Sequence, residues 1–139
     1  MKYPAIYDMH RDGWNDYWRM AVYKTNKAML KGLADEGIKD FTADTLALVH
    51  PSATYTHKDE YGGFASDMFA TLFVSQENMG SEVLCHESVH IALAHERYVL
   101  RYGMDYGDDC NPDEERLAYF TGKVFRGIVE TLRRHKHME

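Results

Sequence analysis

The feature that most constrains the fold is an unbroken stretch in the second half of the chain. Residues 83–102 contain no proline and no glycine, and their apolar side chains recur at a spacing that buries one side of a helix. In the middle of this stretch the chain reads His-Glu-Ser-Val-His, from His86 to His90. A helix places these two histidines one turn apart on the same face, so both imidazoles can reach one point in space.

Two imidazoles that converge from one helix face are a common part of a zinc site. We therefore predict that His86 and His90 bind Zn²⁺, and that Glu87 acts as the general base and acid toward a zinc-activated water. Two imidazoles and a carboxylate favour zinc, although manganese and cobalt stay open. The alternative is an amphipathic helix that carries two histidines and a glutamate on its surface.

A catalytic zinc usually has three protein ligands, so a third must come from outside this motif. In one known arrangement a glycine ends the helix and a third histidine follows, but Leu93 and Glu96 occupy those positions here. We expect His95 and Glu96 to be polar residues on the outer part of the helix. The third ligand is therefore expected on the next helix.

That next helix is predicted over residues 112–135. Asn111 suits the N-cap, the proline after it fits the first helical position, and Glu114 can reach back to the amide of the cap. Glu115 has no capping role and lies on the same side as Ala118, whose small side chain permits a close approach to the first helix. We assign Glu115 as the third ligand, with Glu114 as the alternative.

The motif at 86–90, the 24-residue spacer at 91–114 and the sequence Glu-Arg-Leu-Ala at 115–118 together resemble a known family. They are similar to the two motifs of the gluzincin branch of the zincin metallopeptidases, in particular the short bacterial and phage forms. The resemblance covers roughly residues 40–130. It implies a zinc-dependent peptidase in which His86, His90 and Glu115 hold the metal and Glu87 activates water.

The resemblance also implies that the edge of a sheet holds an extended peptide substrate by backbone hydrogen bonds. We expect this edge near Gly63–Ser66, where a plain hairpin turn is the alternative. A further group should stabilise the developing oxyanion. We take Tyr119, one turn after Glu115, as the first candidate, with core packing as its alternative role. Other candidates for the oxyanion, or for orienting the histidines, are Tyr98, Tyr102, Tyr106, His57, His95, Asp105, Asp108 and Asp109.

The remaining pattern predicts a single α+β domain over residues 1–139, with a small mixed sheet packed on the motif helix and the third-ligand helix closing the site. Residues 3–15 show no clear period, and we predict an irregular segment there. The expected strands cover 18–23, 45–49 and 68–74, the last one interior to the sheet, and the expected helices cover 25–36, 79–102 and 112–135.

Composition limits the partners. The net charge is −6, which argues against nucleic acid and anionic lipid, and the basic residues at 133–137 suit the last turn of a helix. The chain has no run of 18 apolar residues and its start lacks the apolar core of a secretory signal, so we expect a soluble, cytoplasmic protein. We expect Cys85 and Cys110 to be reduced, and Cys85 to be a small buried residue rather than a ligand.

Three hypotheses about function follow from these residues. The first is a zinc metallopeptidase that acts on peptides or proteins in general. The second is a regulatory peptidase for one protein partner, such as a repressor or an antitoxin. The third is an interaction protein that zinc stabilises without catalysis. Exchange of Glu87 for glutamine separates them, because only the first two need its carboxylate for their function.

Overall fold

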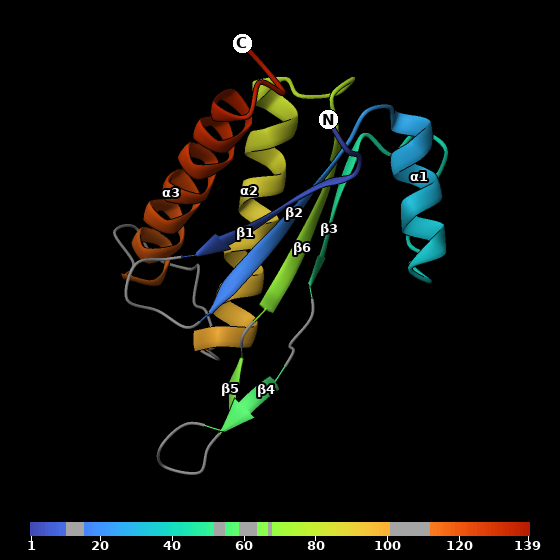
Figure 1. Cartoon of the computed structure of the whole chain (residues 1–139). Coiled ribbons are helices and arrows are strands. Elements are labelled where there is room, and N and C mark those ends of the chain that lie inside the picture. Colours follow the sequence, from blue (N-terminus) through green and yellow to red (C-terminus); the bar gives the residue numbers. More distant parts are fainter. Residues whose placement is uncertain (11–15, 52–54, 59–63, 67, 101–111) are drawn as a thin grey trace.

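The protein is built on a four-stranded mixed sheet with helices on both faces (Figure 1). The computed structural model describes residues 1–10, 16–51, 55–58, 64–66, 68–100 and 112–139. In the sheet, the strands lie in the order β1 (Ala5–His10), β2 (Tyr17–Tyr23), β6 (Met68–Ser75) and β3 (Ala47–Pro51). The central strands β2 and β6 are parallel, and the two outer strands pair antiparallel with them. This arrangement confirms the predicted α+β class.

The two faces of the sheet are covered by different helices. Helix α1 (Asn26–Asp35) packs on one face against Ala21, Tyr23 and Phe73. The other face, with Met20 and Val22, carries α2 (Ser81–His95), the π-helical turn η1 (Glu96–Leu100) that continues it, and α3 (Pro112–Arg134). Neighbouring residues of β2 thus enter opposite cores, as the period of two requires. A separate two-stranded sheet contains β4 (Tyr55–Lys58) and β5 (Phe64–Ser66).

Most predicted elements are confirmed within two residues of their expected bounds. The Thr25 hydroxyl caps α1 by accepting a hydrogen bond from the Ala28 N–H, and Gly37, just beyond the helix, has a φ of 79°. Strand β6 is interior to the sheet, as expected from its apolar run. In the described part of the chain, no helix has both the length and the apolar character needed to cross a membrane.

The prediction of an irregular segment at residues 3–15 was wrong, because residues 5–10 form β1. This strand lies at the edge of the sheet and has only one covered face. Tyr7 and Met9 pack toward the core but are only partly buried, and Ile6 on the other face is 49% exposed. An apolar residue on the solvent side and a tyrosine on the core side conceal the alternation that usually reveals a strand.

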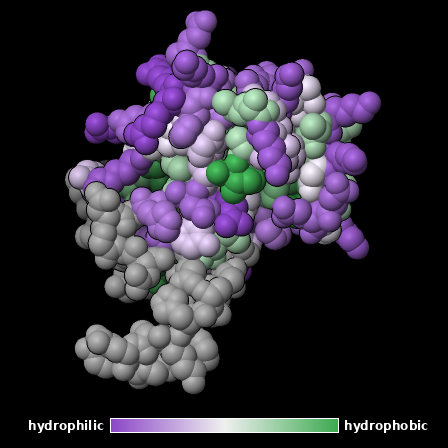
Figure 2. All heavy atoms as spheres, in the orientation of Figure 1, coloured by the Kyte–Doolittle hydropathy of each residue, from purple (hydrophilic) through white to green (hydrophobic). Residues whose placement is uncertain are grey.

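The surface in the orientation of Figure 1 is largely hydrophilic. Figure 2 shows hydrophobic side chains there only in small groups between charged and polar ones. Isolated apolar side chains of this kind are normal on a folded surface and do not indicate a docking face.

The end of the chain returns to β1 through a buried histidine. His137 is 5% exposed, and its Nε2 atom lies 2.6 Å from the Tyr7 hydroxyl oxygen. Burial is the main cause that lowers the pKa of His137, and the nearby His135 lowers it further. The folded state therefore binds fewer protons at this site than the unfolded chain as the pH falls below the ordinary histidine value of about 6.5.

A pH dependence of stability follows from His137. The stability that neutral His137 contributes is fully present above the ordinary histidine pKa. It is lost as the pH falls toward the lowered pKa of His137 in the folded state. We expect the His137→Gln protein to be about 1 kcal/mol less stable at pH 7.5, and to lose less stability than the native protein between pH 7.5 and 5.5. Thermal unfolding at both pH values checks this. The His10→Gln protein, changed at an exposed histidine, should keep the native pH dependence; equal pH dependence in all three would contradict the assignment.

Candidate metal and catalytic centre

His86 and His90 lie side by side on the exposed face of α2. Their Nε2 atoms are 3.2 Å apart, and the two ring planes meet at 65°. Two nitrogen ligands of a tetrahedral zinc ion, each about 2.0–2.1 Å from the metal, are about 3.3 Å apart. The pair thus has the separation that one tetrahedral ion requires of two of its ligands. The donor atoms fit zinc in both type and spacing.

Glu87 lies beside this pair but is buried. Its side chain is 9% exposed, against 68% for His86, and its Oε1 atom lies 4.0 Å from Nε2 of His86. Burial raises the pKa of the Glu87 carboxyl; His90, His86 and a hydrogen bond donated by the backbone of Val49 in β3 each lower it. Helix α2 therefore presents two solvent-accessible imidazoles next to a carboxyl that the sheet partly shields from water.

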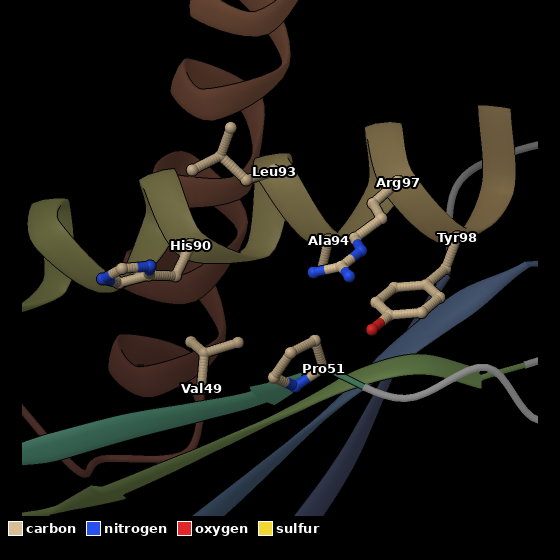
Figure 3. A pocket seen from close by; sticks show the side chains of 7 residues that line it. All are labelled: Val49, Pro51, His90, Leu93, Ala94, Arg97 and Tyr98. Carbon is tan, nitrogen blue, oxygen red and sulfur yellow. The ribbon is translucent and has the colours of Figure 1, made fainter. Parts of the chain in front are cut away.

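Two pockets lie between β3 and α2, one on each side of this group. The first, called here the Glu82 pocket, has a volume of about 490 Å³ and is lined by Thr45, Leu46, Ala47, Glu82, Val83, His86 and Glu87. The second, the Arg97 pocket, has a volume of about 190 Å³ and is lined by Val49, Pro51, His90, Leu93, Ala94, Arg97 and Tyr98 (Figure 3). Residue numbers increase along β3 and α2 together from the first pocket to the second, so the two elements run in the same direction past the histidines.

Strand β3 is the edge of the four-stranded sheet that lies next to α2. Among the described strands, none pairs with its outer side. The N–H group of Val49 points away from β6, since it bonds to Glu87, so Val49 and Ala47 present their backbone groups to the open side. The edge beside the histidines is thus β3 and differs from the predicted one, because Phe64–Ser66 belongs to the separate β4–β5 sheet and Gly63 lies outside the described residues.

The structure does not bring all predicted site residues together. Glu115 is exposed in the first turns of α3, and within the described ranges no three His, Cys, Asp or Glu side chains form a group that could hold a metal ion. Tyr119 is 69% exposed, and the Nζ atom of Lys123 lies 4.7 Å from its ring centroid. Neither pocket beside the histidines is lined by Tyr119, whereas Tyr98, another predicted candidate, lines the Arg97 pocket together with His90.

The expectation that His95 and Glu96 lie on the outer part of the helix was wrong, since each is only 2% exposed. Nε2 of His95 lies 3.3 Å from a carboxylate oxygen of Asp16, and its ring stacks on Phe120. Glu96 accepts two hydrogen bonds, of 2.6 and 2.8 Å, from the guanidinium of Arg116. Polar groups can be buried when they are paired in this way, and these partners are distant in the sequence.

Other predictions have mixed outcomes. Cys85 was expected to be buried but is an exposed free thiol. The roles proposed for Tyr102, Asp105, Tyr106, Asp108, Asp109, Cys110, Asn111 and the side chain of His57 lie outside the described part of the structure.

Sequence reasoning overlooked two contributors to the site, Val49 and Arg97. Arg97 was detectable, since it follows His90 by seven residues, two turns along the same helix face. Val49 carried no local signal, because its position depends on the order of the strands. Comparisons of the chain with protein-family models, curated proteins and solved structures found no match. The function has to be inferred from the residues themselves.

Proposed function

We propose that this protein is a zinc-dependent peptidase whose centre is formed by His86, Glu87 and His90. The observation that carries the proposal is the 3.2 Å separation of the two Nε2 atoms, with a buried carboxyl oxygen 4.0 Å from one of them. Two surface histidines without a function would not require a buried carboxyl beside them. Together, these groups supply two metal ligands and a proton acceptor within one turn of helix.

When bound, zinc supplies a Lewis acid that activates water and polarises the carbonyl of a scissile peptide bond. In the proposed reaction, Glu87 takes a proton from the attacking water and later delivers it to the leaving amine. The hydrogen bond from Val49 holds the carboxyl of Glu87 beside the histidines. Burial keeps bulk water from competing for the proton.

Strand β3 is proposed to position the substrate. A peptide can extend the sheet by pairing with the open side of β3, which presents the backbone of Ala47. Such a peptide passes directly over the histidines, because both pockets lie between β3 and α2. The Glu82 pocket and the Arg97 pocket then receive side chains on opposite sides of the scissile bond. Tyr98 replaces Tyr119 as our first candidate to stabilise the oxyanion, since it lines a pocket that His90 borders.

Glu115 remains our proposed third zinc ligand. Its support is the spacing from the histidine motif, its exposed position near the start of α3, and the pairing of its neighbour Arg116 with Glu96, which ties this turn to the end of the motif helix. We expect the Glu115→Gln protein to bind zinc at least about tenfold more weakly. Loss of a residue that only hydrogen-bonds to a zinc ligand already lowers zinc affinity about 10- to 100-fold.

Zinc affinity in competition with a chromophoric chelator measures this effect. The matched control is Glu114→Gln, one residue away, which should keep the native affinity. If Glu115→Gln binds zinc as tightly as the native protein, Glu115 is not a ligand. A loss confined to Glu114→Gln would transfer the role to that residue.

The proposed function is tested with a diverse peptide mixture and mass spectrometry. Zinc-loaded protein should generate new peptide termini, and protein stripped by a chelator should generate none until zinc is restored. Zinc binding without any cleavage would overturn a general peptidase. A chelator-dependent fall in melting temperature would then favour zinc-stabilised interaction. Cleavage of one co-purifying protein, with inertness toward the mixture, would favour a dedicated regulatory peptidase.

A further inference from the structure

The Arg97 pocket combines one positive charge with mostly apolar walls. Val49 and Pro51 come from β3, and Leu93 and Ala94 come from α2. In Figure 3 the guanidinium of Arg97 and the hydroxyl of Tyr98 point into the space that His90 borders. None of the described residues that line it is acidic. The pocket therefore offers hydrogen-bond donors and a positive charge to whatever enters it.

Arg97 differs in its partners from Arg19, Arg116 and Arg126. Arg19, Arg116 and Arg126 each have a carboxylate oxygen close to the guanidinium, at 2.8, 2.6 and 2.9 Å. In the described ranges no carboxylate forms such an ion pair with Arg97, and its Cζ atom lies 5.4 Å from the centroid of the Tyr98 ring. A guanidinium with a forked set of donors beside apolar surface is suited to a carboxylate.

We propose that the Arg97 pocket is a specificity subsite that receives an acidic side chain of the substrate, with Arg97 as the specificity-determining residue. This inference rests on the proposed peptidase function and names its substrate class. A volume of about 190 Å³ leaves room for one aspartate or glutamate side chain. Arg97 pairs with the carboxylate through its forked guanidinium.

The direction of the substrate follows from the geometry of β3. Strand β3 runs from the Glu82 pocket toward the Arg97 pocket. A peptide paired antiparallel with β3, the more stable arrangement, runs the opposite way. Its residues then enter the Arg97 pocket before the scissile bond and the Glu82 pocket after it. The carboxylate is therefore an internal side chain on the amino-terminal side of the cut, and not the free C-terminus of the peptide.

The test uses the full zinc-loaded chain and three sets of otherwise identical peptides. The first set is blocked at both ends with a single glutamate scanned along the sequence, the second has glutamine in its place, and the third has glutamine and a free C-terminal carboxylate. Cleavage is measured as kcat/KM. Binding is measured by fluorescence anisotropy with the zinc-loaded Glu87→Gln protein, which does not require turnover.

We expect kcat/KM and binding affinity to be about tenfold higher with glutamate before the cut than with glutamine. This factor is at the low end of the effect of a hydrogen bond to a charged group, because Arg97 is exposed. Salt should reduce this preference. Arg97→Met should abolish it in both assays, and Arg97→Lys should keep part of it. The matched control Arg126→Met removes a charge from the exposed face of α3 and should leave the preference for glutamate intact.

The outcomes separate the subsite from the peptidase. Cleavage with equal rates for glutamate and glutamine, or a preference that survives Arg97→Met, overturns the subsite and leaves the peptidase. Absence of cleavage, with an Arg97-dependent binding preference, overturns the peptidase and leaves the subsite. A preference for the free C-terminal carboxylate overturns the assignment to an internal side chain, and absence of any binding preference overturns the subsite altogether.

Discussion

Replacement of Glu87 by glutamine is expected to reduce peptide cleavage by about 10²- to 10⁴-fold, the usual contribution of a general acid–base group. The amide has nearly the same shape and can still accept the hydrogen bond from Val49, but it cannot take a proton. Because His86 and His90 are unchanged, zinc should remain at one ion per chain. Measurements of kcat/KM and of zinc by elemental analysis on the same preparation test both parts.

The stability of this variant gives an independent check. Glu87 is 7% exposed, so removing its charge removes a desolvation penalty and should not lower the melting temperature. Glu130→Gln, at an exposed position on α3, is the matched control and should keep full turnover. Retention of native turnover by Glu87→Gln would exclude Glu87 as the base. If both turnover and zinc were lost, Glu87 would have to act through the metal site rather than on the proton.

The parts of the fold that sequence predicted depend on local periodicity. The helices at 25–36, 79–102 and 112–135 follow from apolar spacing and from end signals such as Thr25, and the interior strand follows from its apolar run. Strand β1 was missed because Ile6 lies on its solvent side and Tyr7 on its core side, so its hydrophobicity does not alternate although its burial does. What local pattern cannot supply is the order of strands in the sheet, which depends on long-range packing.

The same distinction applies to the site. His86 and His90 are one turn apart, so the helix alone determines their geometry. The backbone of Val49 donates a hydrogen bond to Glu87 from a strand that is distant in the sequence, and no sequence pattern near Val49 predicts this contact. The assignment of Glu115 as a ligand depends on how α2 and α3 pack against each other, which local sequence does not predict. The π-helical turn at Glu96–Leu100 has more residues per turn than an α-helix, so α-helical spacing does not predict the directions of its side chains.

Replacement of Arg116 by methionine is expected to destabilise the fold by about 2–3 kcal/mol. The side chain of Glu96 is 3% exposed and accepts two hydrogen bonds from Arg116, so the variant leaves a buried carboxylate without this partner. Loss of one partner of a fully buried pair costs more, but Arg116 is 33% exposed and water can reach the vacated position. Denaturant unfolding measures the difference.

A double variant distinguishes loss of the ion pair from simple loss of packing. Glu96→Met with Arg116→Met removes both charges, and we expect this protein to be more stable than Arg116→Met alone. Arg126→Met, on the exposed face of the same helix, should not change stability measurably. If the double variant were no more stable than the single one, the charge of Glu96 would not be the cause.

The ion pair also bears on function, because Glu96 is followed directly by Arg97 and Tyr98. Both side chains line the pocket beside His90, and the pair with Arg116 anchors the first residue of their π-helical turn to α3. Arg116→Met should therefore weaken the preference for acidic substrates. It should also weaken zinc binding, because the same ion pair ties the turn that carries Glu115, our proposed third ligand, to the end of the motif helix. Native zinc affinity in the folded variant would contradict a ligand at Glu115 that depends on this ion pair.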